Sequence, residues 1–372
     1  MAVVVAPDVT VRRQTSPVSA GERIQALDII RGFALFGMIL VHFHQKMRVD
    51  VAGVEDLIPW GVWILVEQKA WGAFALLFGA GFAILLRRLD ARGANVVPIY
   101  LRRLTTLAIF GIIADVGFGF HILFEYACWG LVLLVVRRWP TRMLLGLAAL
   151  ASSARPIAAM LLPRAADAHV IALSDAVDAA AAHGSYTRLL AARWALFAGS
   201  FADSWRVIVP DSNLALFIIG LLAVRSGVFD EPRRHVRLII GWMTFGVVSW
   251  ALAWVAPITN GFGIIEDQWL CFTYVGGLVL LLAYRPEWTS RLALVGFAGR
   301  MALTNYMVQA VVLDALSSAY GAHLKLRPFA YVAAALLLFI AVAVVSRAWL
   351  RRFSFGPLER VWRTATYASL VT

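Results

Sequence analysis

Charged side chains are scarce in this chain. Only 15% of its 372 residues are charged, whereas a soluble domain carries about 25%. Hydrophobic residues make up 61% of the chain, and they fall in blocks of roughly 17–25 residues, the length at which a helix crosses ~30 Å of hydrocarbon. The composition excludes an ordinary soluble domain and predicts an all-α, polytopic transmembrane helical bundle.

Cysteine is also rare in this chain, and no secretion signal is predicted. The two cysteines, Cys128 and Cys271, both fall inside apolar blocks, so we expect packing residues rather than a disulfide or a metal site. Met1–Arg23 has no apolar core followed by a small-residue cleavage site, so no cleaved signal peptide is predicted. Residues 1–22 are expected to form a disordered cytosolic tail.

Positive charge gathers where the apolar blocks end. The net charge of +12 comes largely from arginine clusters at such junctions, including Arg87 with Arg88, Arg102 with Arg103, and Arg351 with Arg352. This placement follows the positive-inside rule and argues against a nucleic-acid surface. We expect these arginines to lie on anionic membrane lipid.

The apolar blocks predict about ten membrane-spanning helices. With the N-terminus inside, every arginine cluster falls on the same membrane face, which favours an even number of spans and both termini in the cytosol of a cell-membrane protein. The expected spans are residues 27–44, 68–86, 102–119, 121–137, 142–162, 212–227, 238–256, 267–284, 294–317 and 329–349.

One long connection, residues 164–210, divides the chain into two transmembrane halves at 23–163 and 211–372. Its second part, Tyr186–Val209, carries aromatic residues at mixed i+3 and i+4 spacing with arginines between them. That pattern is typical of an amphipathic helix lying on a membrane surface or covering a cavity. We expect this connection on the extracytoplasmic side.

Arg31 and His42 lie eleven residues apart in the first span. Eleven steps return a helix to within ~20° of the starting face and cover ~16 Å. One stripe therefore carries a cation near one membrane edge and an imidazole near the other. Because such groups are costly in lipid, we expect them to face the interior of the bundle or an aqueous cavity.

Each polar group on this helix also has a purely structural interpretation. Asp28 precedes Arg31 by one turn, so the two can form an ion pair at the helix start. His42 can be a hydrogen-bonded core histidine instead of a functional one. His44 points to another face, so we expect no metal site from the two histidines.

Several motifs resemble those of the YeiB family of bacterial membrane proteins. They span nearly the whole chain in the family's order: Leu27-Asp28-Ile29-Ile30-Arg31-Gly32-Phe33-Ala34-Leu35, Glu67-Gln68-Lys69, Phe74–Phe82, Tyr100–Leu104, Gly299–Tyr306, Phe355–Glu359, Trp362-Arg363 and Tyr367.

The family is similar to a larger group of transmembrane acyltransferases, which includes acyltransferase family three and the heparan-α-glucosaminide N-acetyltransferases. Family-three enzymes carry an arginine, ten residues and a histidine in the first helix, which is the spacing of Arg31 and His42. The resemblance implies that acyl-CoA, with acetyl-CoA the first choice, enters from the cytosol and meets an acceptor from the far side. The chain departs from the family at Ala114, Asp115, Phe120 and His121.

These observations define a candidate site. His42 and Asp28 are the candidate catalytic pair, and no metal is expected. Cofactor-binding candidates are Arg31, Lys69, Arg102 and Arg103. Substrate-binding candidates are Glu67, His121, Glu125, Asn305 and Gln309. Glu67 and Lys69 can also be residues that snorkel to the interface, and Asn305 and Gln309 can be interhelical hydrogen-bonding groups.

The function expected from the resemblance is transfer of an acyl group to a hydroxyl or amine of a small-molecule or glycan acceptor. The alternative is a proton-coupled transporter or exporter, with His42, Asp28 and Glu67 as a proton relay. A non-catalytic membrane scaffold is a third reading. The oligomeric state is open, a homodimer included.

Overall fold

The computed structural model describes residues 25–51, 53–161, 165–202, 209–255 and 267–367. The expected tail at 1–22 lies outside these residues. Within them the chain folds as an all-α bundle, as predicted, and the one β feature is an isolated bridge between Arg48 and Leu326.

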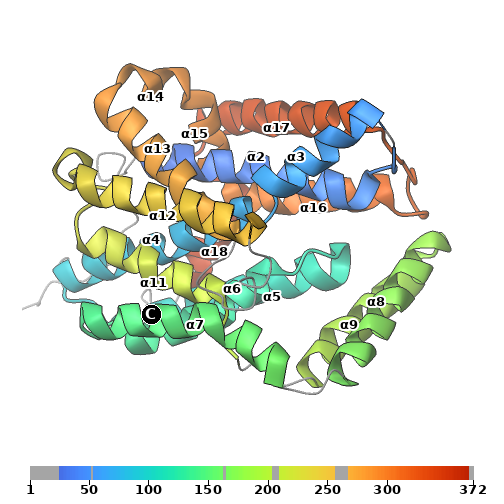
Figure 1. Ribbon diagram of the computed structural model, residues 1–372, viewed down its shortest axis with the longest axis horizontal. Helices are drawn as coiled ribbons and strands as arrows, with labels where there is room; N and C mark the ends of the chain where they lie inside the picture. The colour runs from blue at the N-terminus through green and yellow to red at the C-terminus, as the bar shows by residue number, and fades with distance from the viewer. Residues whose placement is uncertain (1–24, 52, 162–164, 203–208, 256–266, 368–372) are drawn as a thin grey trace, which may run out of the picture.

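Most helices run side by side along the long axis of the molecule (Figure 1). The helices of the first half are α2 (Gln25–Met47), α3 (Leu57–Leu65), α4 (Lys69–Ala91), α5 (Val96–Phe118), α6 (Ile122–Val136) and α7 (Thr141–Leu161). The connection between the halves contains α8 (Ala165–Ala182) and α9 (Tyr186–Ala202). The second half contributes α11 (Ser212–Arg225), α12 (Val236–Val255), α13 (Cys271–Tyr284), α14 (Glu287–Arg291), α15 (Ala293–Arg300), α16 (Ala302–Ser317), α17 (Pro328–Leu350) and α18 (Pro357–Tyr367).

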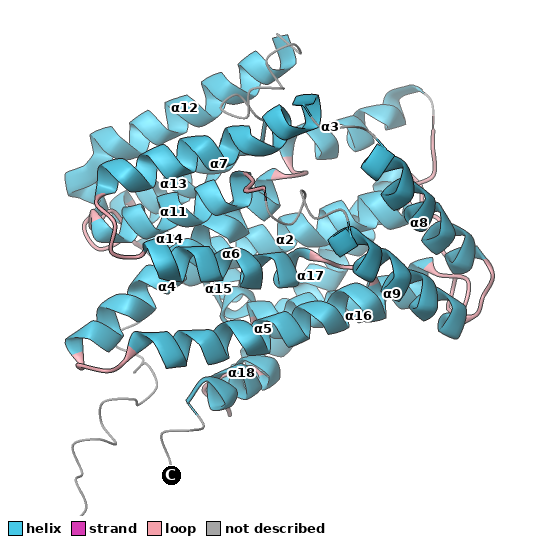
Figure 2. Ribbon diagram, turned by 90° about the horizontal axis from the view of Figure 1, so that it is seen from below, coloured by secondary structure: helices cyan, strands magenta, loops and turns pink. Residues whose placement is uncertain are grey.

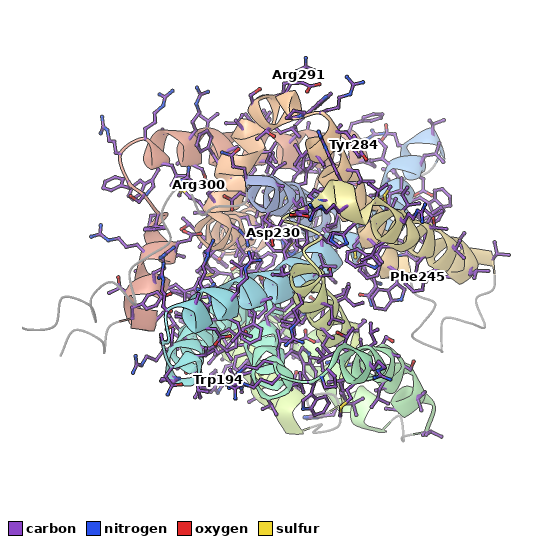
Figure 3. The ribbon with its side chains drawn as sticks, turned by 90° about the vertical axis from the view of Figure 1, so that its left-hand side faces the viewer. Trp194, Asp230, Phe245, Tyr284, Arg291 and Arg300 are labelled. Atoms are coloured by element: carbon purple, nitrogen blue, oxygen red, sulfur yellow. The ribbon has the colours of Figure 1, made fainter. Side chains whose placement is uncertain are left out.

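Within the described residues, five helical stretches have the length and apolar composition needed to cross a membrane: Gln25–Met47, Gly53–Ala91, Val96–Phe118, Pro232–Val255 and Pro328–Leu350. Shorter apolar helices cover Ile122–Val136, Ser212–Arg225 and Gln268–Tyr284. Large apolar side chains also face outward, as Phe245 of α12 does in Figure 3. An outer surface of this kind suits contact with lipid.

One predicted span is not a single helix. Residues 294–317 divide into α15 and α16 at Met301, whose backbone (φ −109°, ψ 32°) is not helical. The amides of Leu303 and Thr304, at the start of α16, donate to the carboxylate of Glu359. The predicted span at 294–317 therefore consists of two helices, and a side chain from α18 caps the second of them.

The first membrane helix, α2, lies at the centre of the bundle. Gly32 and Gly299 let α2 and α15 approach closely: a methyl group on Gly32 would collide with the Val295 carbonyl, and one on Gly299 with the Asp28 carbonyl. Because both contacts are with backbone atoms, neither can be relieved by a rotamer change. This packing fixes the position of the helix that carries Arg31 and His42.

The connection between the two halves forms an antiparallel pair, α8 and α9, at one end of the bundle (Figures 1 and 2). The buried Arg193 of α9 binds the fully buried Asp314 of α16 through two hydrogen bonds, of 2.5 and 3.0 Å. Asp314 also accepts from Ser318 and Tyr320. Burial, followed by this donation to Asp314, raises the pKa of Tyr320. The ion pair thus fastens α9 to the bundle.

Candidate active site

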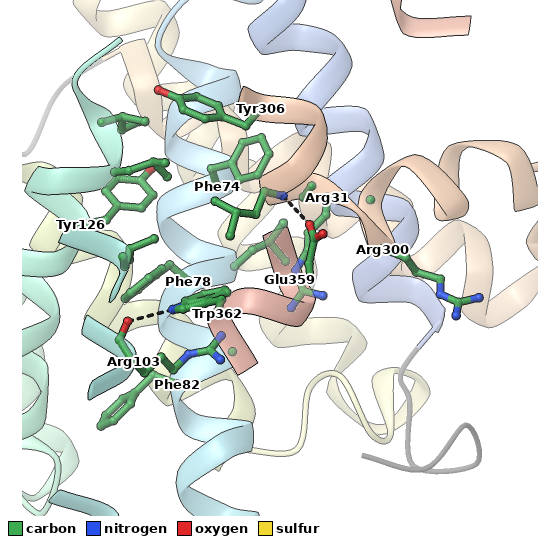
Figure 4. Close-up of a pocket in the computed structure, with 18 of the residues that line it drawn as sticks. Arg31, Phe74, Phe78, Phe82, Arg103, Tyr126, Arg300, Tyr306, Glu359 and Trp362 are labelled. Atoms are coloured by element: carbon green, nitrogen blue, oxygen red, sulfur yellow. Dashed lines mark hydrogen bonds between the residues drawn. The ribbon is translucent and has the colours of Figure 1, made fainter. Parts of the chain in front are cut away.

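A first cavity, of about 260 Å³, opens beside Arg31 and is called the arginine cavity here. Helices α2, α4, α5, α6, α15, α16 and α18 form its walls. Aromatic rings and aliphatic side chains cover most of the wall, including Phe74, Phe78 and Tyr126 (Figure 4). Four arginines belong to the lining: Arg31, Arg103, Arg300 and Arg363.

Arg31 is held by the ion pair that the sequence predicted. Its Nη1 lies 2.9 Å from Oδ1 of Asp28, one turn earlier on α2. The Asp28 side chain is 7% exposed and that of Arg31 29% exposed. Asp28 therefore orients the arginine, while the guanidinium keeps surface available to a ligand.

Helix α18 closes part of the same cavity. The Trp362 indole donates to the Arg103 carbonyl over 2.8 Å, and the Arg103 guanidinium stacks 3.6 Å from a Trp362 ring. Glu359, from the same helix, caps α16 with hydrogen bonds of 2.8 and 3.0 Å (Figure 4). Burial raises the pKa of Glu359, and its hydrogen bonds to Thr304 oppose that rise.

A second, larger cavity of about 970 Å³ lies beside His42 and is called the histidine cavity here. Residues of α8 and α9 line it, including Asp178 and Arg193. Its polar lining also includes Lys46, His121 and Lys325. The α8–α9 pair thus covers a cavity, which is one of the two positions that the sequence pattern allowed.

His42 is 5% exposed, and its ring stacks edge-on against Phe120 at 4.4 Å. Gln309 is fully buried close to it. Neither Nδ1 of His42 nor either polar atom of Gln309 has a hydrogen-bond partner among the described residues. Buried polar groups are rarely left unpaired, so His42, which lines the histidine cavity, is poised to bind a group from a ligand.

The two cavities meet at three side chains, Met38, Ile122 and Tyr306, which line both of them. Arg31 lies on one side of this partition and His42 on the other. The stripe on α2 therefore connects the two cavities past a mostly apolar barrier.

Glu125 and its neighbours form a polar cluster on the wall of the histidine cavity. Arg155 binds both Glu125, at 3.3 Å, and Asp211, at 3.1 Å. Asn213 donates to the same two carboxylates. Two acidic groups and one arginine thus share a single network, which can hold hydroxyl groups of a polar ligand.

Of the predicted site residues, Arg31 and Arg103 line the arginine cavity, and His42, His121 and Glu125 line the histidine cavity. Asn305 is bound to the Ala298 carbonyl and to Ser346, as interhelical packing requires. Glu67 accepts from Gln45. Neither cavity lining includes Glu67, the buried Lys69, Arg102, Asn305 or Gln309.

The sequence-based selection missed Arg300, Glu359, Trp362 and Arg363. These residues stand in motifs that carried the family resemblance, yet they lie far along the chain from Arg31. For Glu359, Trp362 and Arg363, the available signal was a motif of charged and aromatic residues after the last apolar block.

Comparison with known proteins shows which protein families this chain resembles. The model described as heparan-alpha-glucosaminide N-acetyltransferase, catalytic, matches residues 23–208, half of the chain. A model described as a protein of unknown function (DUF418) matches residues 223–369.

Relatives that match over nearly their whole length support a family assignment for this chain. The uncharacterized protein YxaH of Bacillus subtilis (strain 168) is 29% identical, with 95% of this chain and 96% of the relative covered. The uncharacterized protein YeiB of Escherichia coli (strain K12) is 27% identical, with 93% and 96% covered. The chain belongs to the YeiB family. No solved structure matches it.

The YeiB family is thereby connected to a transmembrane acyltransferase-like catalytic domain. The two matched regions meet in the arginine cavity of this YeiB-family protein, because Arg31 and Arg103 come from the first region and Arg300 and Glu359 from the second. Neither region alone contains the whole site.

Proposed function

We propose that this protein is a membrane acyltransferase that moves an acyl group, in the first instance acetyl, from acyl-CoA to a hydroxyl or amine acceptor. The observation that carries the proposal is the placement of Arg31 and His42 on one face of α2, in two cavities that share a partition. The match to an acetyltransferase catalytic model supports it.

In this proposal the arginine cavity receives the donor. Arg31 and Arg103 bind phosphate oxygens of CoA, since guanidinium groups form charge-assisted bonds with phosphate. The apolar wall accommodates the pantetheine arm and the thioester. The acyl carbon passes between Met38 and Tyr306 toward His42.

His42 serves the chemical step in one of two ways. As a general base, it takes a proton from the acceptor while the acceptor oxygen or nitrogen attacks the thioester carbonyl. As an acyl carrier, its ring nitrogen first takes the acyl group and then passes it to the acceptor. In both, the C–S bond breaks, the new ester or amide forms, and the CoA thiolate takes up the acceptor's proton.

Binding of CoA is the first test. Arg31→Ala and Arg103→Ala are each expected to raise the Kd for acetyl-CoA by ~10-fold or more, the equivalent of ~1.4 kcal/mol. Isothermal titration on protein in lipid nanodiscs measures this.

The matched control is Arg102→Ala, which removes a neighbouring arginine outside the cavity lining. A similar loss for all three variants would indicate a general effect of charge. No binding of CoA to the wild type at millimolar concentration, together with proton-coupled solute uptake in liposomes, would instead favour the transporter.

The same proposal requires an orientation in the membrane. We expect Arg137–Arg142 and the C-terminus in the cytosol, and the α8–α9 pair outside, because the arginine clusters lie on one face. A cysteine placed at Asp178, in a background lacking Cys128 and Cys271, should react with an impermeant maleimide in intact cells. Reaction only after the membrane is broken would overturn this orientation.

A further inference from the structure

One group of cations in the histidine cavity has no role in the chemistry above. Lys46 and Lys325 both line the cavity. The Lys325 ammonium donates to the Lys46 carbonyl over 3.2 Å, which places it at the end of α2. Among the described residues neither lysine forms an ion pair.

Arg193 completes the group. Its Nη atoms are bound to Asp314 and to the Gly117 carbonyl, but its Nε is buried without a hydrogen-bond partner among the described residues. A methyl group on Gly119 would lie 3.4 Å from both the Arg193 Nε and the Lys46 Nζ. The two cations therefore lie close together on the same side of Gly119, whose φ is +76°.

Two positive groups facing each other repel, and a buried N–H without an acceptor costs ~1–3 kcal/mol. An oxyanion between them would remove both costs at once. Asp314, Asp178 and Asp115 lie within electrostatic reach of Lys46 and offset the positive charge of the group. The subsite therefore suits a ligand with a single anionic group better than a polyanion.

This pair of cations lies beside the reactive end of the cavity. Lys46 follows His42 by one helical turn, so the two share a face of α2 at ~6 Å along the axis. The Phe120 ring contacts both, at 4.4 Å from the His42 ring and 5.0 Å from the Lys46 ammonium. One sugar ring can span that separation, with a hydroxyl at His42.

We propose that Lys46, Lys325 and Arg193 form an oxyanion subsite, and that the acyl acceptor is a hydroxylated molecule of sugar size carrying one carboxylate or phosphate group. The choice of acceptor rests on the proposed acyl transfer, whereas the subsite itself does not. The Glu125–Arg155–Asn213 network on the same cavity wall is available to the other hydroxyl groups.

Equilibrium binding tests the subsite without any turnover. The probes are glucuronate, glucose 6-phosphate and glucose, titrated into protein in nanodiscs. We expect glucuronate or glucose 6-phosphate to bind ~10-fold or more tightly than glucose, and whichever does so identifies the anion as carboxylate or phosphate. Binding of all three with equal Kd, or of none, would overturn the proposal.

Two variants locate the effect. Lys46→Gln/Lys325→Gln should reduce the preference for the anionic sugar to less than ~3-fold. The single change Lys325→Gln, at an exposed side chain, should reduce it in part even if the double variant fails to fold. Arg138→Gln, an exposed arginine outside the cavity, is the matched control and should keep the full preference.

The same preparations are titrated with acetyl-CoA, so that the two proposals can fail separately. Intact CoA binding with no anion preference would remove the oxyanion subsite alone. An anion preference that depends on Lys46 and Lys325, without CoA binding, would retain the subsite and remove the acyltransferase.

Discussion

Replacing His42 by alanine is expected to reduce acyl transfer by ~10²–10⁴-fold, the usual contribution of a general acid–base group, and to leave CoA binding unchanged. Loss of stability should be modest, since Nδ1 of His42 has no hydrogen-bond partner among the described residues that would be left unsatisfied. The measurements are the rate of CoA thiol release in the presence of acceptor and the melting temperature of the same protein.

His44→Ala is the matched control, two residues further along α2. The His44 ring bonds the Tyr331 hydroxyl over 3.2 Å and lies outside both cavity linings. Its removal should therefore lower the melting temperature more than the rate. Equal losses of rate and melting temperature in His42→Ala would identify His42 as a packing residue and end its catalytic assignment.

The largest expected effect on stability belongs to Asp314. Asp314→Ala leaves the Arg193 guanidinium buried without its counter-ion, a change that costs ~3–5 kcal/mol. The melting temperature should fall by ~5 °C or more, because the lost contact also fastens the α8–α9 pair. Thermal unfolding in detergent, followed by circular dichroism, measures the change.

Two further variants distinguish the effect of breaking this buried ion pair from the general effect of removing a charge. Glu231→Ala breaks an exposed ion pair with Arg234 and should cost less than ~1 kcal/mol. Arg193→Met/Asp314→Leu removes both buried charges and should be less damaging than Asp314→Ala alone. A double variant as unstable as the single one would show that packing, not the unpaired charge, dominates.

Local periodicity made part of the site predictable. Arg31 and His42 share a helix, so the rise and rotation per residue relate them without any tertiary information. The pairing of Asp28 with Arg31 follows from the same spacing and is confirmed.

Helical periodicity alone could not predict which faces of α4 and α18 are turned toward the site. Gln68, whose backbone has φ 64°, interrupts the helical conformation between α3 and α4. The rotation of Lys69 relative to Glu67 therefore does not follow a single helical period. Trp362 meets Arg103 across 259 residues. The break at Met301 likewise depends on Glu359, 58 positions further along the chain.

The shared wall of Met38, Ile122 and Tyr306 has a consequence for the cell that makes this protein. Chambers that reach toward opposite faces of a membrane would, if joined by water, dissipate the gradients that the membrane maintains. In the proposed acyl transfer, a barrier of a thioether, an aliphatic side chain and a phenol would let a small uncharged acyl group pass while ions and protons stay on their own sides. A protein working in that way would join two compartments chemically and keep them electrically insulated.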